Sequence, residues 1–463
     1  MKKENDISRR SFLKSSALVG AAGVLGTGAA GTILTSCNGG GEKGPQYTPL
    51  KKQGEYYIPE LPDKAPDGKE LKAGLIGCGG RGTGAAINFL NAANGVTIVA
   101  LADTFKDRLD SCADHLKKEK GIDIPADKRY IGLDAYKKLI DEGGVDVIID
   151  ATPPLFRPYH FQYAIEKGKH AFLEKPICVD AKGYRTIIAA SKMALAKGLS
   201  VVTGTQRNHQ RSYVEAYKRI MDGMIGEITG GNVYWNGGML WYKEPQPGWS
   251  DCEAMIRDWV NWKWLSGDHI VEQHVHNIDV FTWMTGLKPV SALGFGSRQR
   301  RVTGDQYDNF SVDFTMENGI HLHSMCRQIS GCSNNISEFI QGAKGTWYGN
   351  SGNDSVIKDL KGNVVWEFDK KAAEEEFKQN DPYVLEHVNW IQHIRANQPI
   401  VISEQTAISN MSALMGRESA YTGKIVTWDE MTASQQDYMP ADISLTGRMD
   451  KSKFVVQVPG TGR

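Results

Sequence analysis

The chain has 463 residues, of which 41% are hydrophobic and 9% aromatic, and this length and composition are typical of a two-domain globular protein. Its 54 basic and 54 acidic side chains give a formal net charge of zero, and they form no Lys/Arg-rich stripe. This charge pattern argues against nucleic acid as a partner, so we expect a small-molecule partner instead.

The first 36 residues have the pattern of an export signal. Arg9-Arg10 precedes a weakly apolar run over 17–34 that is rich in Ala and Gly and is a poor membrane span. Leu34-Thr35-Ser36-Cys37 then matches a bacterial lipoprotein processing site. We predict twin-arginine export to the periplasmic side, with membrane attachment only through a lipid on Cys37; the alternative is an ordinary cysteine behind a simple cleavable signal. Residues 37–70, rich in Gly, Pro and Lys, are predicted to be a linker.

Six further cysteines follow, with no C-x-x-C pair and no metal-finger spacing. A protein exported after folding does not need disulfides to fold, so we expect buried thiols. The spacing of Cys326 and Cys332 leaves a disulfide between those two open.

A strand–loop–helix pattern typical of dinucleotide binding begins at residue 71. The apolar segment 71–76 runs into Gly77-Cys78-Gly79-Gly80-Arg81-Gly82, a helical segment follows over 83–91, and the apolar segment 96–102 ends at Asp103. Gly77 permits the tight turn, Gly79 lets the backbone approach a pyrophosphate, and Gly82 lets the helix pack closely on the strand. The helix N-terminus then offers N–H groups and a positive dipole end to the phosphates.

Asp103 is spaced to accept hydrogen bonds from both hydroxyls of the adenine ribose. Its charge would repel a 2′-phosphate, so we predict NAD as the cofactor, with NADP less favoured. The candidate cofactor-binding residues of the loop are Gly77, Gly79, Gly80, Arg81 and Gly82. The alternative is a Gly-rich loop without a ligand.

The alternation of helices and strands continues and predicts a doubly wound parallel sheet of Rossmann type over residues 71–205. Helices are expected at 106–119, 134–141 and 159–167, and strands at 145–150 and 199–203. A loop at the carboxyl end of a parallel strand faces the ligand crevice, so Thr152 and Pro153 are candidate cofactor contacts. His160 is expected to pack against or cap its helix.

The tripeptide Glu174-Lys175-Pro176 joins the glycine loop and the Ala-Thr-Pro loop as a third feature, and the segment 272–279, with the sequence EQHVHNID, is a fourth. On these features, residues 71–430 resemble the glucose–fructose oxidoreductase / inositol dehydrogenase (Gfo/Idh/MocA) family. The resemblance implies an α/β fold in which the Rossmann domain precedes a C-terminal α/β domain, residues 206–463, with a large open, mostly antiparallel sheet. It also implies a homo-oligomer, either a dimer or a tetramer.

The family's lysine and histidine flank the nicotinamide and the reacting carbon, which assigns Lys175 and His276 to catalysis. Hydride transfer from a carbinol needs a group that takes the hydroxyl proton. Lys175 is a partner for that oxygen, and His276 is a proton acceptor or relay. Glu272, one helical turn earlier, is expected to orient the imidazole or to bind a sugar hydroxyl. Glu174 is a candidate cofactor contact.

The motif departs from many relatives, which have Asp at position 272 and Gly at position 274. The extra imidazole makes His274 a candidate substrate contact. A rival interpretation is a metal site made of Glu272, His274, His276 and His269, because these side chains are good zinc ligands. We favour no metal, since His274 and His276 are two residues apart and no H-E-x-x-H motif is present.

Residues 235–264 contain six of the eleven tryptophans, interrupted by Gly and Pro. Aromatic faces stack on the C–H faces of sugar rings, so we expect one or two of these rings at the substrate, Trp241 first, and the others in the core. Arg207 is a further candidate substrate contact, and a packing role between the domains is equally open. Further helices are expected at 213–222, 381–395 and 408–422, and strands at 310–316, 319–325 and 337–341, before a loop-rich end from 425.

Export adds a constraint, because free NAD is scarce outside the cytoplasm and a protein exported after folding can carry its cofactor along. We therefore expect tightly bound NAD(H) that is recycled in place. The favoured function is an NAD-dependent dehydrogenase of a sugar, glycoside or polyol hydroxyl. A second hypothesis is a redox-neutral glycosidase; the exported NAD-dependent α-N-acetylgalactosaminidases resemble the chain in domain plan but lack Glu-Lys-Pro. A third is a non-catalytic sugar-binding lipoprotein, which the joint presence of Asp103, Lys175 and His276 disfavours.

Overall fold

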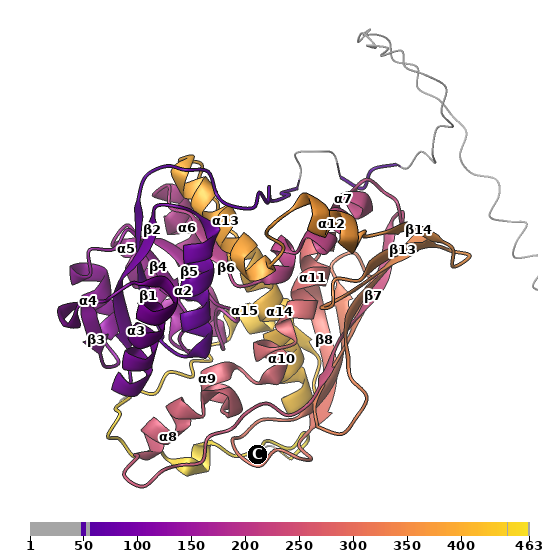
Figure 1. Ribbon diagram of the computed structural model, residues 1–463. Coiled ribbons are helices and arrows are strands. Elements are labelled where there is room, and N and C mark those ends of the chain that lie inside the picture. The colour runs from indigo at the N-terminus through magenta and orange to yellow at the C-terminus, as the bar shows by residue number, and fades with distance from the viewer. Residues whose placement is uncertain (1–47, 52–55, 442, 462–463) are drawn as a thin grey trace, which may run out of the picture. The chain divides into compact units, whose positions relative to one another are not determined.

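Two β-sheets with helices between them organise the chain, as the computed structural model in Figure 1 shows. The structure describes residues 48–51, 56–441 and 443–461, which belong to one compact unit. The predicted signal, Cys37 and part of the predicted linker lie outside the described residues. In the part that is described, no helix combines the length and the apolar character of a membrane span.

The first sheet has six parallel strands and confirms the predicted Rossmann fold. Its spatial order, 3-2-1-4-5-6, is the order of dinucleotide-binding sheets. The strands in this order are β3 (Arg129–Ile131), β2 (Val96–Asp103), β1 (Leu71–Ile76), β4 (Val147–Asp150), β5 (His170–Leu173) and β6 (Val201–Thr203). The order reverses between β1 and β4, so the carboxyl ends of these two strands open a crevice for a ligand.

Helices cover both faces of this sheet because its strands are apolar on both sides. One face packs against α2 (Gly80–Ala92), α3 (Lys106–Lys120) and α13 (Pro382–Arg395). The other packs against α4 (Ala135–Glu142), α5 (Arg157–Glu166) and α6 (Ala181–Ala196). Neighbouring residues of β1 therefore enter different cores, Leu75 the first and Ile76 the second. Helix α13 comes late in the sequence, yet it packs on α2 of the Rossmann sheet.

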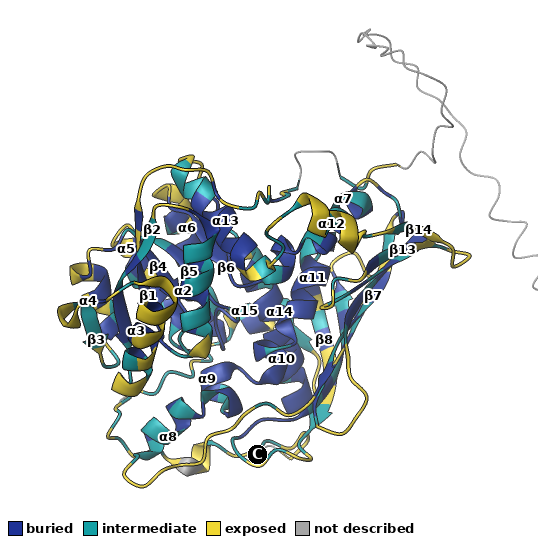
Figure 2. Cartoon of the chain, viewed as in Figure 1, coloured by how far each residue is buried: buried dark blue, intermediate teal, exposed yellow. Residues whose placement is uncertain are grey.

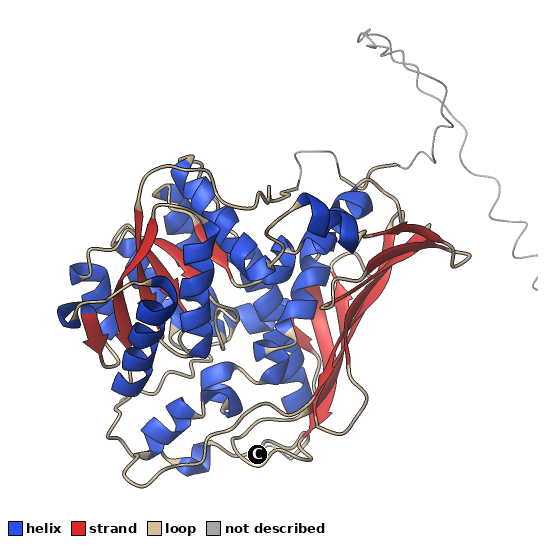
Figure 3. Ribbon diagram, viewed as in Figure 1, coloured by secondary structure: helices blue, strands red, loops and turns tan. Residues whose placement is uncertain are grey.

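The second sheet has nine strands and is antiparallel except where β7 pairs with β10, which confirms the expected large, mostly antiparallel sheet (Figure 3). Its strands in spatial order are β14 (Val364–Glu367), β13 (Ser355–Asp359), β12 (Gly345–Asn350), β11 (Asn335–Gly342), β7 (Ile228–Gly237), β10 (His321–Gln328), β9 (Asn309–Met316), β8 (Pro289–Ser297) and β15 (Val426–Thr427). The three strands expected from the sequence correspond to β9, β10 and β11.

The helices between the sheets are largely buried, as the dark blue ribbons of Figure 2 show. Helices α11 (Val275–Thr285) and α14 (Ser403–Thr422) cover the inner face of the second sheet, and α14 also packs on α6. The short α10 (His269–Glu272) packs on α14 and ends at a candidate catalytic residue. One hydrophobic core therefore runs from α4, α5 and α6 to the second sheet.

Shorter elements complete the chain. They are a 3₁₀ helix at Gln206–His209, α7 (Arg211–Met221), α8 (Asp251–Arg257), a 3₁₀ helix at Trp259–Asn261, α9 (Lys263–Ser266), α12 (Lys370–Glu376), α15 (Trp428–Ala433), and 3₁₀ turns at Ala126–Lys128 and Lys451–Lys453. The end of the chain, expected to be loop-rich, contains β15 and α15 before an irregular tail. The thiols Cys78, Cys112, Cys178, Cys252 and Cys326 are free and buried as expected, whereas Cys332 is free and exposed.

Candidate active site

The glycine loop between β1 and α2 has the shape that a pyrophosphate needs. Gly77 has φ of +90°, and a Cβ on it would lie 2.7 Å from the backbone nitrogen of Thr152. A Cβ on Gly82 would lie 1.8 Å from the carbonyl oxygen of Gly77, so α2 crosses the turn at the closest possible distance. Helix α2 begins at Gly80 after Gly79, which supplies no side-chain cap. Its first N–H groups are thus left for an anion.

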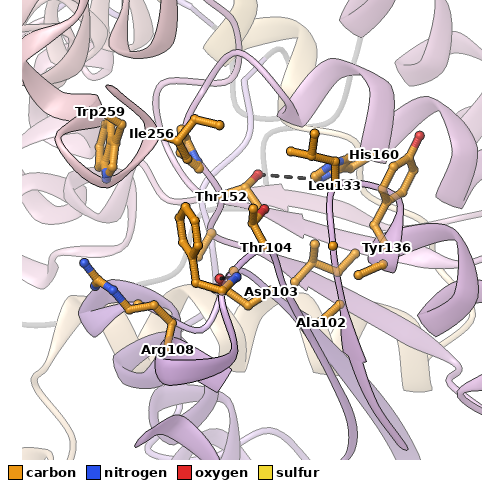
Figure 4. A pocket seen from close by; sticks show the side chains of 18 of the residues that line it. Ala102, Asp103, Thr104, Arg108, Leu133, Tyr136, Thr152, His160, Ile256 and Trp259 are labelled. Atoms are coloured by element: carbon orange, nitrogen blue, oxygen red, sulfur yellow. Dashed lines mark hydrogen bonds between the residues drawn. The ribbon is translucent and has the colours of Figure 1, made fainter. Parts of the chain in front are cut away.

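A pocket beside this loop fits the adenosine half of a dinucleotide (Figure 4). Asp103 and Thr104 line it at the end of β2, and Thr152 and Pro153 line it at the end of β4. The remaining wall includes Leu133, Tyr136, His160, Arg108, Ile256 and Trp259. The predicted cofactor contacts at the ends of β2 and β4 therefore share one cavity with the glycine loop.

Asp103 serves two purposes in this pocket. Its Oδ2 accepts a hydrogen bond from the backbone N–H of Cys78 at 2.6 Å, and its Oδ1 accepts one from Phe105 at 2.8 Å. These bonds fix the glycine loop, and the remaining lone pairs are free for ribose hydroxyls. Burial raises the pKa of Asp103, although the two backbone donors act to lower it.

His160 packs as the sequence predicted, and it also lines the cofactor pocket. Its Nδ1 lies 3.2 Å from Oδ2 of the buried Asp150, and its ring packs against Tyr136 at a tilt, with centroids 4.1 Å apart. Thr152 donates to Asp150 through its hydroxyl at 2.7 Å. The loop after β4 is therefore held by the carboxylate of Asp150, which His160 also contacts; the sequence predicted only a packing or capping role for His160.

Lys175 and Glu272 meet, although 97 residues separate them. Lys175 follows β5, and its peptide bond to Pro176 is cis. Its Nζ donates to the carbonyl oxygen of Glu272 at 2.7 Å and to the Oε1 of Glu272 at 3.1 Å. Both side chains are mostly buried. One ammonium hydrogen remains for a substrate oxygen, since the lysine has three donors and two are used.

His276 lies in the first turn of α11, stacked on Trp235 of β7 with ring centroids 5.6 Å apart and planes 21° apart. The guanidinium of Arg207 lies 5.7 Å from the same indole. Burial lowers the pKa of His276 well below its usual value, and the positive charges of Lys175 and Arg207 lower it further. The imidazole is therefore neutral at ordinary pH, and it can accept a proton from a neighbouring hydroxyl.

His274 and Arg207 are engaged inside the protein. The Nε2 of His274 lies 2.7 Å from the hydroxyl of Ser324 on β10, and its Nδ1 lies 3.2 Å from Oδ1 of Asn277. Arg207 forms a buried ion pair with Glu338 of β11. These contacts fit the packing role that the sequence left open for Arg207. For both residues, direct substrate contact stays a prediction without support from these bonds.

Arg81 connects the glycine loop to the residue before Lys175. Its Nε donates to Oε1 of Glu174 at 2.5 Å, and its Nη2 lies 3.5 Å from Oε1 of Glu386 on α13. Both carboxylates are buried, and burial together with the negative charge of Glu174 raises the pKa of Glu386 well above its usual range. Arg81 and Glu174, two predicted cofactor contacts, are thus also partners of each other.

The tryptophan-rich segment lies largely against the cofactor crevice. Trp241, Trp249 and Trp259 line a second cavity of about 490 Å³ together with Gly79, Gly80, Arg81 and Gly82. Trp241 is 44% exposed and meets Trp259 edge-on at 6.1 Å. Trp264 is buried in a separate cluster with α8. The sequence predicted these rings at the substrate or in the core. It did not predict that three of them line a cavity with the glycine loop, because more than 100 residues separate the two segments.

No group of three or more His, Cys, Asp or Glu side chains in the described part of the chain is arranged to hold a metal ion. His276 stacks on an indole, and His274 bonds to a serine and an asparagine instead.

Comparison with known proteins gives matches along most of the chain. The description "Oxidoreductase family, NAD-binding Rossmann fold" matches residues 71–202, and "GFO/IDH/MocA C-terminal domain" matches residues 213–348. A twin-arginine translocation pathway signal sequence matches residues 6–26. The matched residues include the glycine loop, Asp103, Lys175, Glu272 and His276.

The curated relatives carry two kinds of name. A "Glycosyl hydrolase family 109 protein" of Streptomyces coelicolor is 27% identical over 227 residues, covering 49% of this chain and 44% of that protein. An "Alpha-N-acetylgalactosaminidase" of Shewanella oneidensis is 26% identical over 51% of this chain and 48% of that protein. The "scyllo-inositol 2-dehydrogenase (NAD(+))" of Bacillus subtilis is 23% identical over 53% of this chain and 63% of that protein. The chain spans about half the length of the first of these relatives.

Solved structures share the fold. The scyllo-inositol dehydrogenase of Lactobacillus casei with bound NAD(H) and scyllo-inositol aligns with a TM-score of 0.58 at 19% identity, covering 77% of this chain and 99% of that one. The aldose-aldose oxidoreductase of Caulobacter crescentus complexed with glycerol aligns with a TM-score of 0.60 at 18% identity over the same shares.

Proposed function

Because the chain belongs to the Gfo/Idh/MocA family of oxidoreductases, has an NAD-binding Rossmann domain and carries a twin-arginine export signal, we propose that it is an exported NAD-dependent dehydrogenase that oxidises a hydroxyl of a sugar, glycoside or polyol. The observation that carries this proposal is the Lys175–Glu272 pair at the carboxyl end of β5, beside the neutral imidazole of His276. A charged donor, a carboxylate and a proton acceptor together suit a carbinol that loses a proton from oxygen and a hydride from carbon.

Each side chain has a proposed part in the reaction. NAD, when bound, accepts the hydride from the carbinol carbon. Lys175 donates its free ammonium hydrogen to the substrate oxygen and stabilises the negative charge that grows there. His276 accepts the hydroxyl proton, and because burial and the charges of Lys175 and Arg207 disfavour a charged ring, it then releases the proton to water. Glu272 positions Lys175 through two hydrogen bonds. Trp241, which lines the cavity over the glycine loop and is partly exposed, stays a proposed contact for the sugar ring.

Lys175 gives the direct test. We expect Lys175→Ala to lose dehydrogenation of every active sugar in a panel, followed by nicotinamide absorbance, while bound dinucleotide remains. The matched control is Lys182→Ala on α6, which removes an exposed bridge to Asp437 of 2.6 Å and leaves the site intact. A Lys175→Ala protein as active as the control would remove the lysine from the mechanism.

Export favours a cofactor that stays bound, because the periplasm has little free NAD to replace it. The proposal therefore includes slow dissociation and recycling of NAD(H) in place, with a second substrate that takes the hydride back. Protein isolated from the periplasm and then denatured should release close to one nicotinamide per chain. Protein that is folded and active only with added NAD would refute the retention.

A redox-neutral glycosidase is the second candidate, and the names of the curated relatives from Streptomyces and Shewanella favour it. There a ring carbinol would be oxidised to a ketone, with bound NAD supplying the hydride acceptor. The neighbouring C–H, acidified by the ketone, loses its proton, and its electron pair forms a C=C bond while the glycosidic oxygen leaves with the electron pair of its own C–O bond. Water then adds across the C=C bond, and return of the hydride to the ketone carbon would restore the hydroxyl. Release of nitrophenol from nitrophenyl glycosides without net change in nicotinamide absorbance would select this candidate over the dehydrogenase.

Two further parts of the proposal concern assembly and attachment. The outer face of the second sheet exposes Leu293 and Phe295 on β8, and Phe295 is 72% exposed, which favours a homo-oligomer through this face. A lipid on Cys37 would attach the folded part to the membrane. Size-exclusion chromatography with light scattering tests the first, and mass spectrometry of the N-terminal peptide tests the second.

A further inference from the structure

A segment from the second half of the chain lies across the dinucleotide crevice. We call residues 249–259 the strap; it comprises Trp249, helix α8 and Trp259. Ile256, Arg257 and Trp259 line the adenosine pocket opposite Asp103, and Trp249, Arg257 and Trp259 line the cavity over the glycine loop. In Figure 4 Ile256 and Trp259 lie across the pocket from Asp103 and Thr104. A ligand in either cavity would thus contact the Rossmann domain on one side and the strap on the other.

Arg257 fastens the strap to α3. Its two terminal nitrogens each lie 3.0 Å from a different oxygen of Asp107, which is the bidentate geometry of a strong pair. Its guanidinium lies 3.8 Å from the ring of Phe105 and 4.8 Å from the ring of Trp249. Glu253 on the same helix holds its Nε at 2.9 Å. The Arg257 side chain is only 14% exposed, whereas the Asp107 side chain is 62% exposed. The arginine is therefore largely buried, and its partner lies at the surface.

The tail of the chain supports the strap from behind. Ser250 donates its hydroxyl to the carbonyl oxygen of Leu445 at 2.5 Å and caps α8 by accepting from Glu253. Phe454 packs edge-on against Trp262, with centroids 5.8 Å apart, in the cluster that buries Ile256. The strap is therefore held on both sides, by an ion pair to the Rossmann domain and by apolar contacts to the tail.

We propose that the strap is part of the dinucleotide site: Ile256 and Trp259 bind the adenosine half, and the Arg257–Asp107 pair keeps the strap closed, so that NAD leaves only when this pair opens. The inference rests on the proposed function, since it assigns to the strap the retention that export requires.

The chemistry of the strap suits a dinucleotide. Trp259 and Ile256 supply apolar surface opposite the polar edge at Asp103, which is how an adenine ring is held between an apolar wall and a few polar groups. Arg257 and Arg108 place two guanidinium groups beside the glycine loop, whose N–H groups already favour an anion. Because the strap covers the bound ligand, its opening sets the dissociation rate more than the association rate.

The test measures exchange of bound NAD on the purified, full-length holoprotein. Protein loaded with isotopically labelled NAD is diluted into a large excess of unlabelled NAD, and the label that remains bound is followed over time. We expect Asp107→Asn and Arg257→Ala to release NAD at least tenfold faster than the unmodified protein, and Trp259→Ala faster still. The control is Lys117→Ala on helix α3, which breaks an exposed 2.9 Å ion pair with Asp123. This variant should release NAD at the rate of the unmodified protein.

The outcomes separate the strap from the proposed function. Equal exchange rates for Asp107→Asn, Arg257→Ala and the control, in proteins that are folded by circular dichroism and still oxidise sugar, would overturn the role of the strap and leave the dehydrogenase intact. An unmodified protein that binds no NAD at all would overturn both. Since Asp107 is an exposed side chain, Asp107→Asn keeps the test valid even if Arg257→Ala folds poorly.

Discussion

Adding one methyl group to Gly82 should close the cofactor site, and the expected size of the effect follows from the structure. The Cβ of Gly82→Ala would lie 1.8 Å from the carbonyl oxygen of Gly77 and 3.0 Å from its carbon. An ordinary contact needs roughly 3.5 Å, so α2 and the turn must separate by about 1.7 Å. Overpacking of this kind costs about 1–3 kcal/mol of stability.

The same displacement moves the N–H groups at the start of α2 away from the positions in which they would bind the pyrophosphate. A misplacement of about 1 Å in a preorganised site costs about 100-fold, which for binding corresponds to about 2.7 kcal/mol. Gly80→Ala is the matched control, because no atom lies within 4 Å of its added Cβ and the fingerprint permits a side chain there. We expect the control to keep its NAD affinity within about threefold and its stability within about 0.5 kcal/mol.

Isothermal titration with NAD on protein freed of its cofactor measures the affinity, and urea unfolding measures the stability. We expect Gly82→Ala to lower both the NAD affinity and the stability, and Gly80→Ala to leave both unchanged. A Gly82→Ala protein that binds NAD as tightly as Gly80→Ala would show that the close crossing of α2 over the turn at Gly77 does not matter for the cofactor, and the argument from the glycine loop would be refuted.

Three other predictions test separate parts of the site. Asp103→Asn removes the charge that repels a 2′-phosphate, and its amide can accept only one of the two backbone hydrogen bonds that Asp103 accepts. Because Arg108 lies on the same wall, the preference for NAD over NADP should fall at least tenfold in paired titrations. Burial lowers the pKa of His274 to about 3 in the folded protein. Between pH 6.5 and 3 this histidine is therefore protonated in the unfolded chain but not in the folded one. The free energy of unfolding should fall by about 1.4 kcal/mol for each pH unit as the pH is lowered through this window. His274→Asn should reduce the slope of urea stability between pH 6.5 and 4.5 by one proton, and an unchanged slope would contradict the shift. Arg81→Ala leaves the buried Glu174 without its cation and should cost about 3–5 kcal/mol. Glu386→Gln should cost less, because burial and the charge of Glu174 raise the pKa of Glu386 and so disfavour its charged form; urea unfolding measures the stability of both variants.

Features carried by nearby residues could be predicted from the sequence. The strand, the glycine loop, the helix and Asp103 lie within about 30 residues, and their spacing fixes their geometry once the parallel sheet forms. The large second sheet came from the family resemblance, since the alternation in β9 to β11 indicates strands but not their partners. The start of α14 was missed by five residues because polar side chains such as Ser403 and Thr406 hide its first turn, although both are buried.

Contacts between distant segments could not be predicted. The guanidinium of Arg257 reaches Asp107 across 150 residues, and Glu386 approaches Arg81 across about 300. Neither pair follows a local period, and each residue alone has the pattern of a solvated charge on a helix. The pairing of Lys175 with Glu272 was also missed: the sequence assigned Glu272 to the imidazole or the substrate, because the helix that would place it beside His276 is broken at Gln273 and His274.

These long-range pairs make the glycine loop and the candidate catalytic Lys175 parts of one unit. Arg81 belongs to the glycine loop and holds Glu174, and Glu174 is joined through a single peptide bond to Lys175, whose ammonium is held by Glu272. A Cβ on Gly204, at the end of β6, would lie 2.6 Å from the carboxylate of Glu174, so glycine at this position leaves the space that Glu174 needs to reach Arg81. A shift of the glycine loop must therefore be felt at Lys175. If the chain retains its dinucleotide as proposed, this coupling would tie the correct placement of Lys175 to the presence of the cofactor.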